Sequence, residues 1–152
     1  MAVNIAELIH KGGVFSEIAG SNPEDVYKFV TEKITLPEGI TSEIVYNSLC
    51  SREKIMSTAV GNGIALPHAR LPLLKDEGEQ RICVVYLKNP LDMDAPDERH
   101  VNVMFIILSA TQQTHLEILS ALVKLFQKTS FKRLLDNHAN EAELLNSIRD
   151  LS

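Results

Sequence analysis

His68 is the first residue whose setting suggests chemistry. It follows the stretch GNGIALP (61–67), in which two glycines lead into a short apolar run that Pro67 ends. Proline fixes its own φ angle and favours an extended conformation in the residue before it. The imidazole therefore stands at the end of a stiff strand, and a neutral imidazole with a pKa of about 6.5 is a competent nucleophile at cellular pH. The plainer alternative is a glycine–proline turn that carries an incidental surface histidine.

A second histidine, His115, lies in the stretch THLE (114–117). These four residues fit a capping box, with Thr114 as the N-cap and Glu117 as the third helical residue. The capping box predicts that His115 lies in the first turn of a helix, where free backbone amides and the helix dipole favour an anion. Together with His68 it could face one phosphate group. The alternative is a solvent-facing polar residue beside a helix cap.

Other chemistries have weaker support. Histidine is a common metal ligand, but the sequence has no HxxxH, HxH or CxxC spacing and offers no evident carboxylate partner, so we expect neither a metal nor a cofactor. A phosphate loop of the GxxxxGKS type is absent, which argues against nucleotide binding. Cys50 and Cys83 are predicted to be buried free thiols. The remaining histidines, His10, His100 and His138, are read as solvated residues without a role.

The elements that must position these histidines are predicted from apolar patterning. Strands are expected at 14–18, 64–66, 81–87 and 101–108. The last two are apolar at nearly every position, which is typical of strands covered on both faces.

Helices are expected on either side of the central strands. The segments are 21–34 (with Asn22 as N-cap), 41–54, 114–128, 130–136 and 140–150. Their inward side chains are predicted to be Val26, Phe29, Val30 and Ile34, then Ile44, Val45 and Leu49, then Leu116, Leu119, Leu122, Val123 and Phe126. The order of elements predicts an α/β fold of three layers, helix–sheet–helix, with a mixed β-sheet.

Composition narrows the class of protein. The 152 residues suit a single domain, 1–152, and a hydrophobic fraction of 45% with a charged fraction of 23% is typical of a soluble protein. The formal charge of -5 gives no support for nucleic-acid binding. No apolar run approaches the ~20 residues of a membrane span, and the first residues lack the order of a secretory signal. We expect a cytoplasmic protein.

The stretch SREKIMSTAVGNGIALPHAR (51–70) resembles the signature of the mannitol/fructose-type enzyme IIA domains of the bacterial phosphotransferase system, a family that includes the nitrogen-regulatory enzyme IIA proteins. That signature runs Arg-Glu, Ser-Thr, then Gly-x-Gly-(Ile/Val)-Ala-(Ile/Leu)-Pro-His. HLEIL, beginning at His115, is similar to the second histidine motif of the family, and PLDMDAPD (90–97) to a turn between its central strands. The resemblance spans nearly the whole chain and is weakest over the first thirteen residues.

This resemblance implies a mannitol-type enzyme IIA fold and a phosphotransferase component that carries a phosphoryl group on Nε2 of His68. The donor would be the phosphocarrier protein HPr or its nitrogen-branch relative. The acceptor would be a cysteine of an enzyme IIB, which would place the chain at the periphery of a membrane transporter at most. His115 would hydrogen-bond the phosphoryl oxygens, with Arg52 and Thr58 as further phosphate-stabilising groups. Glu53 is better explained as a structural partner or a helix-end charge than as a base, and no metal is required.

Two functions stay open on these residues. One is a phosphotransferase component of sugar transport; the other is a regulatory binding module in which phosphate on His68 controls contact with a target protein. The stand-alone length and the DMDA segment (92–95) favour regulation, whereas PHAR (67–70) also occurs in fructose-type members. Arg70 is interpreted as a solvated charge. A domain like the cytoplasmic part of anion exchangers shares the fold class but has no reason to keep both histidines.

Overall fold

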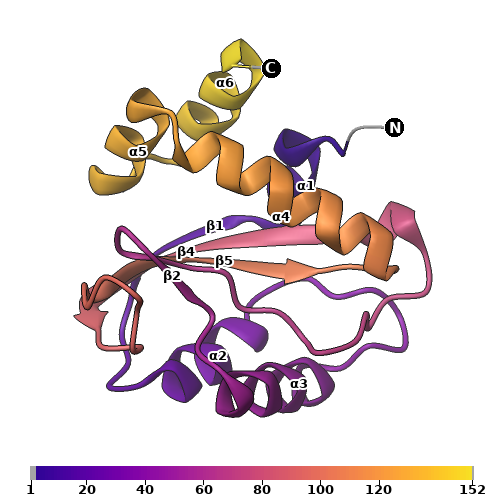
Figure 1. Cartoon of the computed structure of the whole chain (residues 1–152). Coiled ribbons are helices and arrows are strands. Elements are labelled where there is room, and N and C mark those ends of the chain that lie inside the picture. The colour runs from indigo at the N-terminus through magenta and orange to yellow at the C-terminus, as the bar shows by residue number, and fades with distance from the viewer. Residues whose placement is uncertain (1–2, 152) are drawn as a thin grey trace.

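The structure, a computed structural model, describes residues 3–151 and consists of a mixed β-sheet between two layers of helices (Figure 1). The sheet has five strands in the order β1-β4-β5-β3-β2. The strands are β1 (Val14–Ile18), β2 (Ala59–Gly61), β3 (Ile64–Ala65), β4 (Arg81–Leu91) and β5 (Val101–Leu108).

Helices cover both faces of this sheet. They are α1 (Ile5–Gly12), α2 (Pro23–Thr31), α3 (Ser42–Ile55), α4 (Gln112–Phe126), α5 (Thr129–Asp136) and α6 (Glu141–Leu151), with a short 3₁₀ helix, η1 (Glu77–Glu79), before β4. In Figure 1, α2 and α3 lie below the sheet, and α1, α4, α5 and α6 lie above it. The predicted helix–sheet–helix architecture is confirmed.

The strands are paired in both directions. β4 is antiparallel to β5, β1 is parallel to β4, and β3 is parallel to β5. Alternate side chains of β4 enter two different cores: Cys83 and Val85 pack toward α2 and α3, whereas Ile82, Val84 and Tyr86 pack toward the other helices. A core on each face explains why the central strands are apolar at nearly every position.

Several inward-facing predictions for the helices are wrong. In α4 the fully buried residues are Ile118 and Leu122, whereas Leu116 is 65% exposed and Val123 is 45% exposed. The apolar side chains of α4 cover a wider face of the helix than the sheet buries. Apolar spacing alone therefore does not show which of them point toward the sheet. Phe29 and Ile44 are also exposed. The ammonium of Lys33 lies over the Phe29 ring, 4.7 Å from its centroid, which partly covers that ring.

The sequence analysis gives no bounds for α1, β2 or η1, and it ends β4 too early. α1 begins after Asn4, whose side chain accepts a hydrogen bond from the backbone amide of Glu7. Asparagine is a preferred N-cap residue, so the sequence itself carries the signal for the start of α1. β2 is short, with two glycines at and near its end, and β4 runs on to Leu91, beyond residue 87 where the expected strand ends.

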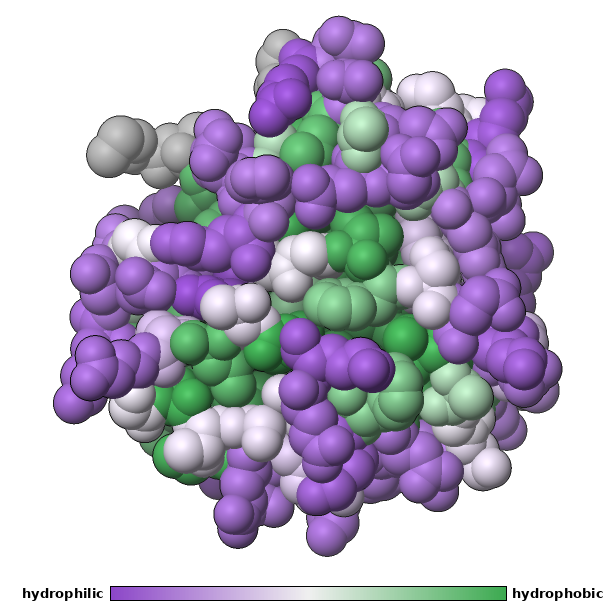
Figure 2. Space-filling model, turned by 180° about the vertical axis from the view of Figure 1, so that it is seen from behind, coloured by the Kyte–Doolittle hydropathy of each residue, from purple (hydrophilic) through white to green (hydrophobic). Residues whose placement is uncertain are grey.

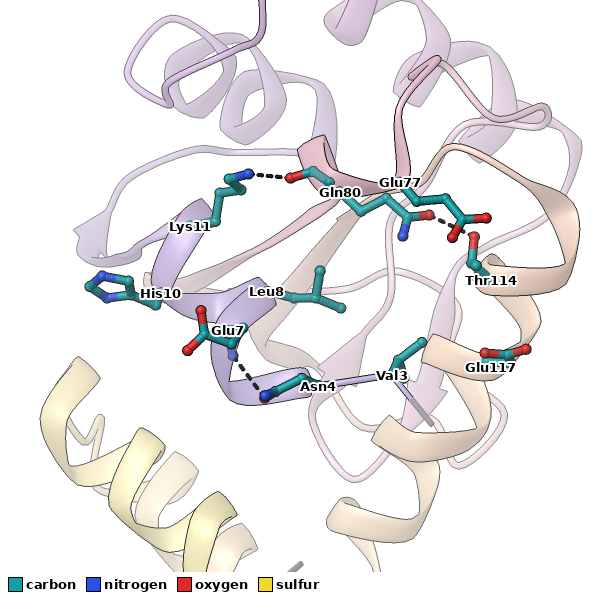
Figure 3. A pocket seen from close by; sticks show the side chains of 11 residues that line it. Val3, Asn4, Glu7, Leu8, His10, Lys11, Glu77, Gln80, Thr114 and Glu117 are labelled. Carbon is teal, nitrogen blue, oxygen red and sulfur yellow. Dashed lines mark hydrogen bonds between the residues drawn. The ribbon is translucent and has the colours of Figure 1, made fainter. Parts of the chain in front are cut away.

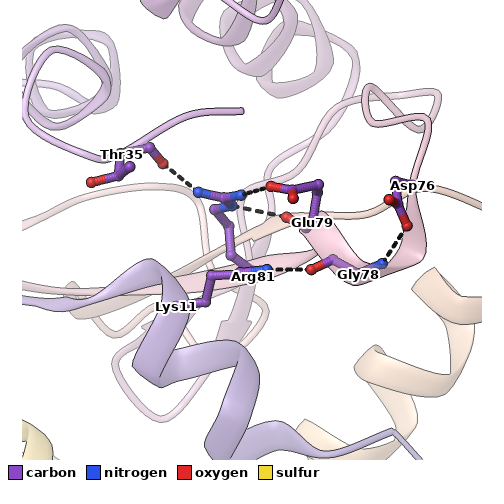
Figure 4. Close-up of polar contacts among 6 residues, drawn as sticks. All are labelled: Lys11, Thr35, Asp76, Gly78, Glu79 and Arg81. Carbon is purple, nitrogen blue, oxygen red and sulfur yellow. Dashed lines mark hydrogen bonds and ion pairs between the residues drawn. The ribbon is translucent and has the colours of Figure 1, made fainter. Parts of the chain in front are cut away.

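The start of β4 is tied to both helical layers by polar contacts (Figure 4). The buried Arg81 guanidinium donates to the carbonyl oxygen of Thr35, at 2.6 Å, and forms an ion pair with Glu79, at 2.8 Å. Lys11 of α1 donates to the carbonyl of Gly78 in η1. A buried arginine with these partners is satisfied, so these contacts hold the loop after α2 and the helix α1 against one end of the sheet.

The surface follows from this layering. Seen from behind, polar residues dominate the top and the bottom of the molecule, and apolar residues gather across the middle of the face (Figure 2). The two cysteines, Cys50 and Cys83, are free and buried, as predicted. Within residues 3–151, no helix combines the length and the apolar character that crossing a bilayer requires.

Candidate functional site

His68 lies at the carboxyl end of β3, held by the strand beside it. The backbone amide of Ile107 in β5 donates to the carbonyl oxygen of Pro67 at 2.9 Å, and His68 forms a single parallel bridge with Ile107. The chain thus continues along β5 after β3 ends, as the proline-stiffened sequence predicts. His68 itself is partly exposed.

The orientation of the His68 ring is set by its own backbone neighbourhood. Nδ1 lies 2.7 Å from the carbonyl oxygen of Leu66. A carbonyl oxygen only accepts hydrogen bonds, so Nδ1 carries the proton. In the neutral ring the lone pair is then on Nε2, which leaves Nε2 as the nucleophilic atom.

His115 faces His68 from α4. The two ring centroids are 4.5 Å apart and the ring planes are inclined by 47°. The predicted capping box is wrong, because the N-cap is Thr111, whose side chain accepts from the amide of Thr114. His115 is consequently the fourth helical residue, and its own backbone amide already donates to the Thr111 carbonyl, at 3.0 Å. Its side chain, and not its amide, is what it can offer to a phosphate.

The start of α4 is anchored to the sheet, which fixes the place of His115. The side-chain oxygen of Gln80 accepts from the amide of Ala110, at 2.8 Å, and from the hydroxyl of Thr114, at 2.6 Å. Figure 3 shows the Gln80–Thr114 contact at the edge of a hollow of about 530 Å³ between α1, η1 and α4. Neither His68 nor His115 lines that hollow. The histidine pair is half-buried and lies apart from that hollow.

Electrostatics keep both rings neutral. Burial lowers the pKa of His68, and the nearby charge of Arg52 lowers it further, while the bond to Leu66 and the carboxylate of Glu53 oppose the change. Burial lowers the pKa of His115 to about 4, with additional contributions from His68 and Arg52. Arg52, in the last turn of α3, therefore acts on both rings, and its guanidinium also donates to the carbonyl of Met56.

Thr58, predicted to stabilise a phosphate, is buried and its hydroxyl already has an acceptor. It is 4% exposed, and its hydroxyl donates to Glu53 at 2.7 Å. A phosphate would compete with that carboxylate for the same proton. The Thr58 carbonyl instead accepts from the amide of Leu66, at 3.0 Å, beside the carbonyl that holds His68.

Glu53 is a structural partner, as expected, and it makes more contacts than the sequence indicates. Besides the hydroxyl of Thr58, it accepts from the Thr58 amide at 2.8 Å and from the hydroxyl of Tyr27 in α2 at 2.7 Å. Tyr27 is a residue that sequence reasoning missed. It lies in an ordinary helical pattern, and no motif links it to the histidine.

The two glycines of the GNG stretch serve the turn between β2 and β3. Gly61 and Gly63 have φ angles of 100° and 79°, a region that side chains disfavour. A Cβ atom on Gly63 would lie 2.8 Å from the side-chain nitrogen, Nδ2, of Asn102, and the backbone amide of Asn62 donates to the Asp97 carboxylate at 2.8 Å. Neighbouring protein groups therefore approach the turn closely at these two positions.

The other candidate residues lie outside the pair. Arg70 is exposed. His10 is also exposed but contacts Glu141, with 3.0 Å between Nδ1 and the carboxylate, and His138 stacks on Tyr86 at a centroid distance of 4.5 Å, so these two are not simply solvated. Among the residues that the structure describes, no three histidine, cysteine or acidic side chains lie together in a way that could hold a metal ion.

The mixed sheet carries the two facing histidines within an α/β domain that has helices on both faces of the sheet. Residues 7–151 match the family described as "Phosphoenolpyruvate-dependent sugar phosphotransferase system, EIIA 2", and the chain belongs to that family. A "Nitrogen regulatory protein" of Klebsiella oxytoca is 30% identical over 145 residues, which are 92% of this chain and 87% of that protein.

Solved structures agree in fold. The crystal structure of the nitrogen regulatory protein IIA-Ntr from Neisseria meningitidis matches with a TM-score of 0.78 at 23% identity, over 95% of this chain and 98% of that one. The IIA-mannitol enzyme in the Escherichia coli complex with phosphorylated IIB-mannitol matches with a TM-score of 0.64 at 17% identity, over 89% and 94% of the two chains.

Proposed function

We propose that the chain is a phosphohistidine carrier that accepts a phosphoryl group on Nε2 of His68 from an HPr-type carrier protein. It then passes the group to an enzyme IIB or uses it as a regulatory switch, and it works in the cytoplasm. The observation that carries the proposal is the bond from Nδ1 of His68 to the Leu66 carbonyl, 2.7 Å long, which leaves Nε2 unprotonated beside His115. This is the arrangement that a neutral imidazole nucleophile needs.

The transfer requires no general base. The lone pair of Nε2 attacks the phosphorus atom, while the bond between phosphorus and the carrier's imidazole nitrogen breaks and its electron pair stays on the carrier. The His68 ring gains positive charge because Nδ1 keeps its proton. The Leu66 carbonyl stabilises that charge, since a hydrogen bond to the charged form favours it. Positioning and charge stabilisation are the main needs of phosphoryl transfer.

His115 and Arg52 stabilise the negative charge of the phosphoryl oxygens. A neutral His115 offers one ring N–H to the phosphoryl oxygens, and Arg52 adds a permanent positive charge near both rings. The exposed side chain of Leu116, next to His115, adds apolar surface on which a carrier protein can dock.

Incubation with radiolabelled phosphoenolpyruvate, enzyme I and HPr tests the proposal. The expected label is stable in alkali and labile in acid, as a phosphohistidine is. His68→Ala should abolish the label, and His100→Ala, which changes an exposed histidine away from the site, should retain it. Labelling that persists in His68→Ala would place the phosphate on another residue.

Regulation is the second candidate function, and the names of the relatives favour it. The Klebsiella oxytoca relative is named a nitrogen regulatory protein and covers nearly the whole chain. Transfer of label from the phosphorylated protein to a purified enzyme IIB separates the two functions. Transfer to the IIB cysteine supports sugar transport. Acceptance from HPr or its nitrogen-branch relative without onward transfer supports the regulatory switch.

A further inference from the structure

The carboxylate of Glu53 lies at the centre of a hydrogen-bond network beside the histidine pair. One oxygen accepts from the hydroxyls of Tyr27 and Thr58, both at 2.7 Å, and the other accepts from the Thr58 amide, at 2.8 Å. The donors come from α2 and from the segment that leads into β2, so this one carboxylate joins three parts of the fold.

From Thr58 the network continues through the backbone to the His68 ring. The amide of Leu66 donates to the Thr58 carbonyl at 3.0 Å, and Nδ1 of His68 donates to the Leu66 carbonyl at 2.7 Å. Glu53 fixes both the amide and the hydroxyl of Thr58. The place of Thr58 sets the place of Leu66, and the direction of the Leu66 carbonyl sets the plane of the imidazole.

We propose that Glu53 is a positioning residue for phosphoryl transfer, acting through Thr58 and Leu66 to hold His68 as the Nδ1-protonated tautomer with Nε2 directed outward. The inference rests on the proposed function, because it concerns the same nucleophile. The hydrogen bonds of the Glu53 carboxylate go to Tyr27 and Thr58, whereas the His68 ring bonds to the Leu66 carbonyl, so Glu53 acts on the ring at second hand. Its effect is to restrict the ring to one orientation before the carrier protein arrives.

A carboxylate suits this role better than an amide. It accepts at both oxygens, which matches one N–H and two hydroxyl donors. In Glu53→Gln the new amide has only one oxygen, so whichever way it faces at least one of the three donors loses its acceptor, and the hold on Thr58 loosens. Glu53→Met, of similar length, removes both acceptors.

Nitrogen-15 NMR of the histidine rings tests the inference without any phosphoryl donor, because the shifts of Nδ1 and Nε2 report the tautomer directly. The parent protein is expected to show His68 almost entirely with Nδ1 protonated. Glu53→Gln should show a measurable share of the other tautomer, and Glu53→Met a larger one. Glu43→Gln makes the same chemical change at an exposed position of α3 and should match the parent.

Phosphorylation rates from HPr complete the test. Glu53→Gln should be slower by up to about 10²-fold, the scale expected for a misplaced reacting group. A folded Glu53→Gln with the parental tautomer and the parental rate would overturn the inference, and this variant decides the matter if Glu53→Met does not fold. If the parent is never phosphorylated but Glu53→Gln still shifts the tautomer, the proposed function fails while the positioning by Glu53 stands.

Discussion

The centroids of the His68 and His115 imidazole rings lie 4.5 Å apart. His68 follows the end of β3, and His115 lies in the first turns of α4. Two imidazolium ions at that separation would repel each other, so the pair is stable only when at least one ring is neutral. Burial and the charge of Arg52 keep the pKa of both rings low. A negative charge placed beside the two rings would therefore be attracted by Arg52 and would favour protonation of a ring.

Phosphorylation of His68 should raise the pKa of His115 from its value of about 4. A phosphoryl group carries negative charge, which stabilises the imidazolium form of a nearby histidine. NMR titration of the His115 ring in the free and the phosphorylated protein measures the change. An unchanged pKa after phosphorylation would show that His115 does not face the phosphate.

His115→Ala should still be phosphorylated on His68, but more slowly. Loss of one donor to developing charge typically lowers a rate by about 10²–10³, whereas the nucleophile itself remains. Rapid-quench measurements of acceptance from HPr and of donation to IIB give the two rates separately. His100→Ala is the matched control. Parental rates in both directions would reduce His115 to a structural residue of α4.

Stability should fall as the pH drops through the range in which the histidines titrate. An unfolded histidine binds a proton below about pH 6.5, whereas folded His115 does so only near its pKa of about 4. Between these pH values the unfolded state binds more protons than the folded state. The free energy of unfolding therefore increases as the pH rises through this range and decreases as the pH falls through it. Urea midpoints at pH 7.5 and 5 measure the loss. His115→Gln should lose less stability than the parent, and an equal loss would contradict the assignment.

The setting of His68 was predictable because its signals are local. Pro67 stiffens the approach to His68 whatever the rest of the chain does, and the structure keeps that geometry along β5. The start of α4 was less predictable. Thr111 and Thr114 are both good N-cap residues, and the Thr114 hydroxyl is drawn away by Gln80, a contact that depends on the fold.

Contacts between distant segments set the limit of the sequence analysis. The Tyr27–Glu53 bond joins α2 to α3, and neither residue carries a pattern that points to the other. The incorrect predictions of inward-facing side chains have a related cause. Leu116 and Ile118 are equally apolar, and only the packing of α4 on the sheet leaves one exposed and buries the other.

Arg52→Met should raise the pKa of both histidines and slow phosphorylation. Arg52 lowers both values in the parent, so removal of its positive charge makes each imidazolium easier to form. The phosphoryl group also loses a stabilising cation, at a cost of about 10² in rate. NMR titration and the HPr assay measure the two effects. Arg133→Met, at an exposed position of α5, is the control. A slower rate without a pKa change would place Arg52 in partner docking instead.

Tyr27→Phe should destabilise the fold by about 1.5–3 kcal/mol, the range for a hydrogen bond to a charged group. The Tyr27 side chain is fully buried, and its hydroxyl donates to Glu53 at 2.7 Å. Phenylalanine keeps the ring packing of α2 and removes only that donor, so the loss reports the bond and not a cavity. Urea unfolding at pH 7.5 measures it. Tyr46→Phe changes a tyrosine that lies only partly buried in α3 and should cost much less. Equal losses in the two variants would show that the Tyr27–Glu53 bond contributes nothing particular to stability.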